Sequence, residues 1–375
     1  MIIIKNIFRI YYLYLILSTL PLQGTTNINL NSNNQNKLIC IDKNKSYKNK
    51  HFFLQESTQK VEYIKLETND NCLIGKEINI ETIRATETDI FIIEMSAIYR
   101  FSRKDGKFLN QIGKRGQGPK EFLTKQSFSI NKNKQEVILY DIGKRKIHIY
   151  DYNGTHKRDI NIPELSQIEV VDEDIFAGVT YDTKTNIPGF GLYSLSNGKL
   201  IKKLSECYTS RSGIVYRLFS KYTTARPNNG EAFFSTYITD NIFSINKNAR
   251  IPRYVFLPPN NGKTTEDNKY CTTPFLICET DLFANIQVHG INTKEMESFI
   301  INKKTGIITK GYIINSDYSG PIFPYNTGVD NEIAALHYAY ILKDREKKGV
   351  LFGKLKEIAK TLDEEDNPVV VIANF

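Results

Sequence analysis

The chain has 375 residues, of which 41% are hydrophobic and 24% are charged, and its formal net charge is +9 at pH 7. This hydrophobic content is enough to build a core, and abundant Tyr and Phe, with Ile and Val in short groups, favour β-strands. A basic chain can bind nucleic acid, but the export signal at its N-terminus argues against that class of partner. The positive charge then indicates either a solvated basic surface or an acidic partner outside the cytoplasm, such as an anionic glycan or a lipid headgroup.

The N-terminal segment, residues 1–24, has the pattern of a signal peptide. Lys5 and Arg9 flank the start of the apolar run "IYYLYLILSTLPL", which is too short to span a membrane as a helix, since a span needs about 20 residues. We expect cleavage after Gly24, with a retained N-terminal anchor as the alternative, and no lipid anchor. The protein is therefore predicted to be exported to the periplasm, the cell surface or the medium. Residues 25–60, rich in Asn, Lys, Thr and Ser, are predicted to be a flexible leader.

From Val61 onward, short β-type runs alternate with two-residue turns. The turns carry Gly or Asn, the residues that tolerate the positive φ such turns require. They recur at intervals of 44–58 residues, and the turn residues are Gly106, Gly154, Gly198, Asn248 and Gly306. A hairpin that returns at about this interval is typical of a four-stranded propeller blade, in which the hairpin is the outer half and two further strands precede it.

Five such hairpins and the segment after Gly306 predict an all-β, six-bladed β-propeller over residues 61–375, with four strands in each blade. Apolar residues at helical spacing between positions 355 and 362 predict a short helix before the final strand "VVVIANF". The early strand at 61–66 has no hairpin partner of its own. We therefore expect it to complete the last blade and close the ring, because an open ring would expose edge strands.

The stretch "GKRGQGP", with Gly113, Gly116, Gly118 and Pro119, invites comparison with a phosphate-binding loop. A Walker loop needs Lys and then Ser or Thr after the second glycine of its Gly-x4-Gly spacing, and Pro119 stands where the Lys should be. A Rossmann fingerprint needs a helix after the glycines, whereas "SFSIN" downstream is typical of a strand. We therefore interpret the loop as a structural turn between the first two blades, with Phe122 packed beneath the second.

The first two blades carry a more specific pattern. The stretches "GKFLNQIGKRGQGPKEF" and "KIHIYDYNGTHKRDI" resemble an NHL-type repeat, with its G-x-F, IG-x-x-G-x-G and [YF]-D-x-x-G elements. From about Val61 to Phe375 the chain resembles exported six-bladed β-propellers of bacterial envelopes, and its closing "NPVVVIANF" is similar to the final strand of that family. The resemblance implies the fold but no activity, since the family is largely uncharacterised and fold alone does not assign function.

Some related six-bladed propellers are hydrolases or lactonases with a metal in the central channel, and this resemblance supplies an alternative function. Under it, a divalent metal would be held by Glu279, Asp281 and His289 of "CETDLFANIQVHG". No cofactor is otherwise predicted, and the other histidines, including His148 and His156, are expected to be structural. The polar residues that are candidates for facing the channel are Glu81, Arg84, Asp174, Tyr181, Asp281, Asn285, His289 and Asp330.

Binding at one face of the ring is the function that the sequence favours over catalysis. The long connections, such as "VTYDTKTNIPGFGLY" and "SKYTTARPNNGEAFF", carry aromatic residues and Arg, which dominate recognition surfaces. The ligand-binding candidates are Tyr181, Phe190, Tyr222, Arg226 and Tyr270. The predicted partner is a glycan, a peptide or a cell-envelope protein, bound by a monomer that has no membrane span once the signal is removed.

The cysteines are Cys40, Cys72, Cys207, Cys271 and Cys278, and an exported protein can oxidise them to disulfides. Cys271 and Cys278 are close enough in sequence to bridge a loop, and two buried free thiols are an equal alternative. The odd number leaves at least one thiol unpaired. No CxxC pair and no histidine at zinc spacing accompany these cysteines, which argues against a zinc site there.

Overall fold

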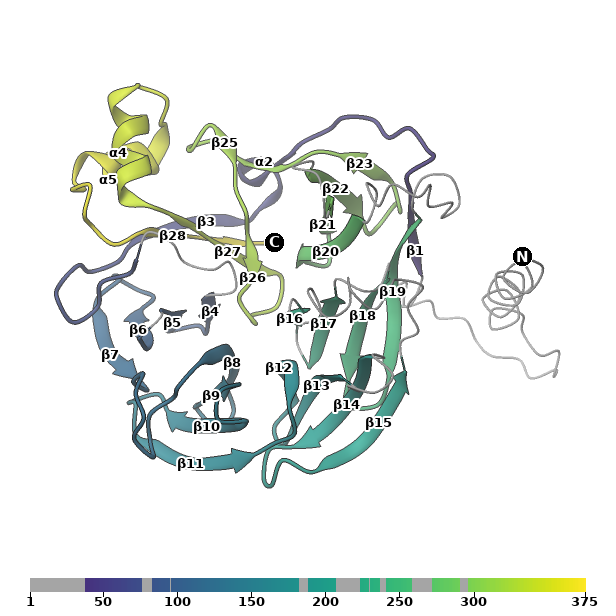
Figure 1. Cartoon of the computed structure of the whole chain (residues 1–375). Coiled ribbons are helices and arrows are strands. Elements are labelled where there is room, and N and C mark those ends of the chain that lie inside the picture. Colours follow the sequence, from purple (N-terminus) through teal and green to yellow (C-terminus); the bar gives the residue numbers. More distant parts are fainter. Residues whose placement is uncertain are drawn as a thin grey trace. The chain divides into compact units, whose positions relative to one another are not determined.

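The structure is a computed structural model, and its described residues are 38–75, 83–94, 96–181, 188–206, 223–228, 230–236, 241–257, 272–290 and 296–375. They belong to one compact unit, Leu38–Phe375, in which β-strands predominate. The described strands form seven sheets, and six of these contain four or five strands. Within five of these six, the four strands of the blade follow chain order from the inside of the ring to the outside (Figure 1).

We number the sheets along the chain. Sheet 1 consists of β4 (Ile83–Ala85), β5 (Asp89–Ile93), β6 (Ile98–Ser102) and β7 (Phe108–Ile112). Sheet 2 consists of β8 (Lys125–Asn131), β9 (Glu136–Asp141), β10 (Lys146–Asp151) and β11 (His156–Asn161). Sheet 3 consists of β12 (Leu165–Asp172), β13 (Ile175–Tyr181), β14 (Pro188–Ser194) and β15 (Leu200–Glu206).

Sheet 4 consists of β16 (Thr223–Asn228), β17 (Glu231–Thr236), β18 (Asn241–Asn246), β19 (Arg250–Leu257) and, at its outer edge, β1 (Ile39–Asp42). Sheet 5 consists of β20 (Thr272–Glu279), β21 (Phe283–Gly290), β22 (Met296–Asn302) and β23 (Ile308–Lys310). The closing sheet consists of β26 (Tyr325–Asn326), β27 (Glu332–His337), β28 (Val369–Asn374) and β3 (Lys60–Lys65). The small sheet consists of β2 (Phe52–Phe53), β24 (Ile313–Asn315) and β25 (Gly320–Pro321), and the helices are α2 (Leu54–Ser57), α4 (Ala339–Lys347) and α5 (Gly353–Lys360).

The predicted hairpins are all present as the outer strand pairs of sheets 1 to 5. The four turn glycines have positive φ angles of 72–84°, as two-residue turns require. The predicted closure is also confirmed, because β3 pairs antiparallel with the C-terminal strand β28 in the closing sheet. The predicted short helix corresponds to α5. The all-β propeller with four-stranded blades therefore follows from the spacing of the turns.

The prediction of six blades is wrong in its count of sheets, because the described strands form seven. The additional one is the small sheet, in which β2 pairs parallel with β24 and β24 pairs antiparallel with β25. Counted as one blade per sheet, the propeller has seven blades. Strands of two or three residues are too short to show a period of two, so the sequence pattern does not reveal them.

The predicted leader ends too late in the chain, because residues 38–60 contain ordered elements. Strand β1 pairs in parallel with β19, and Ile41 is only 1% exposed in the core beside it. The Lys50 N–H donates a hydrogen bond to the Lys310 carbonyl at 2.8 Å. This segment covers the outer edge strands of sheets 4 and 5, whose backbone groups would otherwise lack partners. Residues 1–37, including the predicted signal, lie outside the described residues.

The hydrophobic core is divided among the interfaces between neighbouring sheets. One cluster joins sheet 1 to sheet 2 and contains Phe122, which the sequence predicted to pack there. Further clusters join sheets 2 and 3, 3 and 4, and 4 and 5, while Ile313 of the small sheet lies in the cluster between sheet 5 and the closing sheet. Ile372 of the closing sheet packs in one cluster with Ile90 and Ile92 of sheet 1, which completes the ring.

An ionic network reinforces this closure. Arg103, just after β6, donates from Nη2 to Glu332 of β27 at 2.7 Å and to Glu62 of β3 at 3.1 Å. Its Nη1 also donates to the Thr86 carbonyl at 3.1 Å. Burial disfavours the charged form of Arg103, but its two carboxylate partners raise its pKa overall. The first sheet and the closing sheet are therefore joined by charge as well as by apolar packing.

The turn glycines also make close contacts with the preceding sheet. A Cβ atom on Gly106 would overlap the carbonyl oxygen of Lys65, the last residue of β3, and one on Gly198 would overlap the carbonyl oxygen of Asn161 in β11. Gly306 has the same φ as Gly106, yet nothing lies within 4 Å of the position of its Cβ. Glycine is thus needed for conformation at all three turns, and for close approach between sheets at two of them.

His337, in β27, gives the fold a defined dependence on pH. Its ring stacks on Tyr318 with a centroid distance of 4.0 Å, and Asn315 Nδ2 lies 3.4 Å from its Nε2. Burial, with a smaller contribution from Arg345, lowers the pKa of His337 to about 3. The unfolded chain, with a histidine pKa near 6.5, therefore binds more protons than the folded chain between pH 6.5 and about pH 3, so stability falls as the pH falls through this window.

We expect His337 alone to lower the free energy of unfolding by about 2 kcal/mol between pH 7 and pH 5. Denaturant unfolding of the wild type and of His337→Gln at both pH values measures this, and the variant should lack that part of the loss. His51→Gln is the control, because His51 is exposed. An equal loss in the wild type and in His337→Gln would show that this imidazole does not titrate as proposed.

Candidate functional site at the channel mouth

The ends of the inner strands border a hollow of about 470 Å³. Its lining comes from the ends of β4, β8 and β12, from the turn between β16 and β17, and from residues 327–330 after β26. These strands are innermost in five different sheets (Figure 1). The hollow that their ends line therefore lies at one end of the central channel. We call this hollow the channel mouth.

A buried polar network joins three inner strands at the channel mouth. Arg84 of β4 donates from Nη2 to Glu169 of β12 at 2.8 Å, and the two side chains are 4% and 1% exposed. Ser129 of β8 donates its hydroxyl to the other carboxylate oxygen of Glu169. An ion pair this deeply buried needs both partners, because either charge alone would be left without compensation. The network therefore fixes sheets 1, 2 and 3 relative to one another.

The channel mouth is acidic although the chain as a whole is basic. The charged residues of its lining are the carboxylates Glu87, Glu169, Asp172, Glu173, Glu231 and Asp330 and the cations Arg84 and Lys132, a net charge of −4. The whole chain carries +9. Glu87, Glu173 and Asp330 are exposed. Their charges therefore face solvent at the opening, where a cationic ligand would meet them first.

Two carboxylates of the channel mouth form ion pairs with cations that lie outside the hollow. Lys247 lies 2.9 Å from Asp172, and Arg253 lies 3.2 Å from Glu231. The hydrogen bond from Lys247 lowers the pKa of Asp172. These pairs make the net charge of the channel mouth less negative, but they do not make it positive. Within the lining, Lys132 Nζ lies 3.9 Å from the exposed Glu87. The lining as a whole still carries more carboxylates than cations.

A second hollow, of about 370 Å³, adjoins the channel mouth and shares Glu87 and Lys132 with it. It runs over the junction between sheets 1 and 2, and we call it the rim groove. Arg100 donates to Asp89 there at 2.7 Å, and Tyr152 is its aromatic lining residue. The channel mouth and the rim groove together form a longer track, which suits an extended ligand better than a compact one.

A family model described as a Domain of unknown function (DUF4934) matches residues 38–374. The chain belongs to the DUF4934 family. The match covers nearly all of the compact unit that begins at Leu38, and not only the two blades that resembled NHL repeats. The assignment to an NHL-type family is therefore not supported. No significant match to a curated protein was found.

The solved structures to which the chain is similar are distant in sequence. A crystal structure of a protein described as a candidate exported protein from Bacteroides fragilis NCTC 9343 aligns with a TM-score of 0.68 and 19% identity, over 90% of this chain and 99% of that chain. A member of the DUF4221 family from Bacteroides vulgatus ATCC 8482 aligns with a TM-score of 0.46 and 8% identity, over 85% of this chain and 98% of that chain. Among the described residues of the DUF4934 chain, no helix is long and apolar enough to cross a membrane.

Of the predicted ligand-binding residues, Phe190 alone has a side chain that the structure of the DUF4934 chain describes. Phe190 is 1% exposed in the core between sheets 3 and 4, where it packs beside Phe234 and Phe243, so it has no surface to offer a ligand. A loop phenylalanine and a core strand phenylalanine look alike in sequence without knowledge of the register. The side chains of Tyr181 and Arg226 are not among the described features, and Tyr222 and Tyr270 lie outside the described residues.

The residues of the predicted channel metal site do not converge. Glu279, at the end of β20, is 4% exposed and binds Tyr254 at 2.7 Å and Lys303 at 2.6 Å. Burial raises the pKa of Glu279 despite the Lys303 partner. Asp281 is exposed in the following turn. His289 lies five residues beyond the ladder partner of Glu279, roughly 17 Å further along β21, and its side chain is not described.

The glycine loop is a structural turn whose polar groups are already used. The Gly118 N–H donates to the Glu121 carboxylate at 2.9 Å, and a Cβ on Gly116 would overlap that same carboxylate. Lys144 donates to the carbonyl oxygens of Gly118 and Glu121. Gly113 has the positive φ of a sharp turn, and Pro119 lies within the loop. A carboxylate therefore occupies the place where a phosphate-binding loop would present free N–H groups.

Two of the residues predicted to face the channel, Arg84 and Asp330, line its mouth. Asp174 instead lies in an exposed turn beside Lys134, and Asn285 is buried and donates to Ser298 within sheet 5. Glu87, Lys132, Asp172 and Glu173 were not predicted from the sequence. These residues lie at the ends of the inner strands or within two residues after them, so the position of each strand end, combined with charge, is the signal that could have identified them.

The cysteines are only partly described. Cys40 is exposed and Cys72 is buried, and both carry free thiols. Cys278 is buried beside the small sheet. Cys207 and Cys271 lie outside the described residues, so a Cys271–Cys278 bridge stays a prediction.

Proposed function

We propose that this DUF4934 protein is an exported interaction module whose channel mouth binds an extended, positively charged peptide segment of an envelope or secreted partner. The observation that carries the proposal is the net charge of −4 in the lining of the channel mouth, against +9 for the chain. Opposite charge at a binding surface accelerates encounter and selects among partners. Export is supported by the signal-like N-terminal segment and by the description of the Bacteroides fragilis neighbour.

A peptide fits the lining better than a glycan, the other ligand class predicted from sequence. The channel mouth has no aromatic residue among its described lining residues, and the rim groove has Tyr152 alone. Pockets for small ligands are usually lined by apolar and aromatic side chains with a few polar groups. Among the polar side chains of the channel mouth carboxylates and amides predominate, and Lys and Arg side chains of a peptide are their natural complement. Among the residues that the structure describes, no cluster in the channel supports the hydrolase alternative, and we do not propose it.

We expect a labelled peptide that alternates Lys and Ser to bind the mature protein, with an affinity that falls as salt is raised. Neutralising the exposed carboxylates in the triple variant Glu87→Gln, Glu173→Gln and Asp330→Asn should weaken binding about tenfold or more, equal to about 1.4 kcal/mol. Fluorescence anisotropy at low and high salt measures this. A peptide that alternates Glu and Ser should not bind.

The matched control removes three carboxylates from the helical region near the C-terminus, in the variant Asp344→Asn, Glu357→Gln and Glu364→Gln. These side chains are 56–67% exposed. The control changes the net charge by the same amount, so it should retain wild-type affinity if the channel mouth is the site. Equal loss in both triple variants would show that the peptide senses total charge only, and the proposal would fail.

A further inference from the structure

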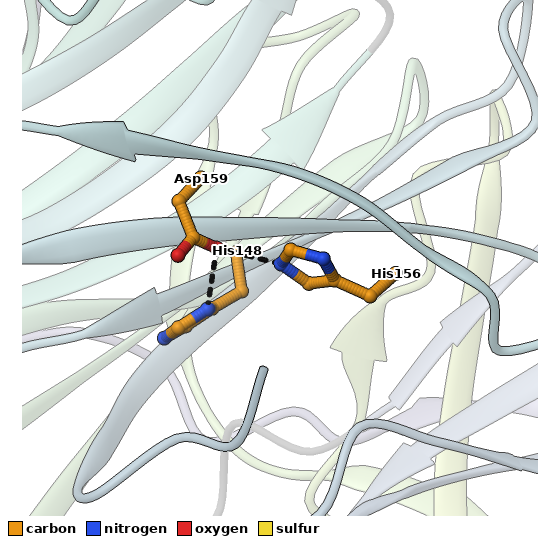
Figure 2. Close-up of side chains that lie close together, drawn as sticks. All are labelled: His148, His156 and Asp159. Carbon is orange, nitrogen blue, oxygen red and sulfur yellow. Dashed lines mark hydrogen bonds and ion pairs between the residues drawn. The ribbon is translucent and has the colours of Figure 1, made fainter. Parts of the chain in front are cut away.

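The outer hairpin of sheet 2 brings together two histidines and an aspartate, His148, His156 and Asp159. His148 of β10 pairs directly with Asp159 of β11 in the antiparallel ladder. His156 and Asp159 are three residues apart and would point to opposite faces of a regular strand. The register shifts near Tyr150, which pairs with His156, and this β-bulge turns His156 onto the face of Asp159 (Figure 2).

The three side chains converge on one point. His148 Nδ1 lies 2.8 Å from Asp159 Oδ1, and His156 Nε2 lies 2.6 Å from the same oxygen (Figure 2). One ligand atom of each residue lies within 4.8 Å of the others. Ligands of a tetrahedral zinc ion bind at about 2.0–2.1 Å and are therefore about 3.3 Å apart. Small side-chain rotations are enough to convert the present separations into that geometry.

A second carboxylate stands behind the cluster. His148 is fully buried, its Nε2 has no hydrogen-bond partner among the described residues, and this atom lies 3.5 Å from Asp141 Oδ2. Asp141 is itself held by the N–H groups of Leu123 and Thr124, at 2.7 and 3.1 Å. If Nδ1 gives its lone pair to a metal, the proton of His148 must be on Nε2, where it faces Asp141. A histidine ligand backed by a carboxylate is the usual outer arrangement of a metal site.

The access to the cluster also suits a cation. Asp159 and His156 are 24% and 15% exposed, so an ion can reach the cluster and retain a water as a further ligand. Lys146 is a cationic competitor among the described residues: its Nζ lies 3.5 Å from Asp159 Oδ2, and its side chain is 35% exposed and can turn toward solvent.

We propose that His148 Nδ1, His156 Nε2 and the Asp159 carboxylate form a binding site for a divalent transition metal of the zinc class. Two imidazoles and one carboxylate suit Zn²⁺ better than Ca²⁺ or Mg²⁺, which prefer oxygen ligands alone. The site lies on the outer strands of sheet 2, whereas the channel mouth is built from inner strands. It is therefore independent of the proposed peptide-binding function, and it is a different site from the channel metal predicted from sequence.

The test titrates tag-free mature protein with zinc chloride in a calorimeter, and with cobalt chloride to record visible absorption. We expect one ion per chain, d–d bands of a low-coordinate site, and a raised melting temperature. His156→Gln and Asp159→Asn should each weaken zinc binding by about 100-fold or more, since even loss of an outer carboxylate costs 10- to 100-fold. His51→Gln, which changes an exposed histidine elsewhere, should bind zinc as the wild type does.

A gain in affinity separates the proposal from simple loss of folding. Lys146→Met removes the competing cation and should strengthen zinc binding about threefold or more. Zinc binding that is equal in the wild type, His156→Gln and Asp159→Asn would overturn the proposal. The absence of zinc binding in the wild type would also overturn it, and would mean that the three residues only form hydrogen bonds with one another.

Discussion

Replacing Gly106 by alanine is expected to lower the free energy of unfolding by about 3 kcal/mol. Two effects add. Alanine at a φ of +72° costs about 1–2 kcal/mol, because its Cβ approaches the following carbonyl. The new Cβ would also overlap the backbone carbonyl of Lys65, which cannot move without disturbing β3, and forcing an extra group into a packed interface costs about 1–3 kcal/mol. Chemical denaturation at pH 7 measures the change.

Gly306→Ala is the matched control for the contact between sheets. Gly306 has the same φ of +72°, but nothing lies within 4 Å of the position of its Cβ. This variant should therefore lose only the conformational part, about 1–2 kcal/mol. Equal losses in Gly106→Ala and Gly306→Ala would mean that the turn glycines serve conformation alone and that the closing sheet does not press on sheet 1 as described.

Removing the buried cation at the channel mouth is expected to have an effect of similar size. In Arg84→Met the carboxylate of Glu169 stays buried and retains Ser129 but loses its counter-charge. Breaking a buried ion pair by removal of one partner costs about 3–5 kcal/mol. Equilibrium unfolding of the variant at neutral pH should show a loss in that range, with the midpoint shifted and the slope against denaturant unchanged.

Two further variants test the reason for that loss. Arg145→Met makes the same substitution in an ion pair with Glu164 whose side chains are 65% and 61% exposed, and it should change stability by about 1 kcal/mol or less. The double variant Arg84→Met and Glu169→Gln removes the stranded charge while Gln can still accept the Ser129 hydrogen bond. It should regain much of the lost stability. A double variant as unstable as Arg84→Met would show that packing of the arginine, and not its charge, is what matters.

The fold could be predicted from sequence because the turns between its strands are marked by single residues in the local sequence. Each outer hairpin is marked by a turn residue that needs or tolerates positive φ, and the spacing of Gly106, Gly154 and Gly198 gives the blade period directly. Closure of the ring by the strand at 61–66 could also be predicted, because that strand has no hairpin partner of its own. The small sheet could not be predicted, because pairing between residues 52–53 and 313–314 is long-range and involves strands too short to show a pattern.

The candidate sites were harder to predict, because they depend on register and on strand ends. The channel mouth collects side chains from five sheets, and Arg84 and Asp330 could be anticipated only as single polar residues near strand ends. The His148–Asp159 pair follows from the hairpin around Gly154 once its register is known. The bulge that adds His156 leaves no clear mark in the sequence, which is why these histidines were expected to be structural.

The central claim, that the channel mouth binds a basic peptide, is tested most directly by locating the peptide on the protein. Carboxyl groups can be labelled with a carbodiimide and an amine, and the extent of labelling at each residue read by mass spectrometry. With the Lys-Ser peptide bound, labelling of Glu87, Glu173 and Asp330 should fall severalfold, while Glu357 and Glu364 keep their labelling. Unchanged labelling at the channel mouth under saturating peptide, with protection elsewhere on the chain, would contradict the claim.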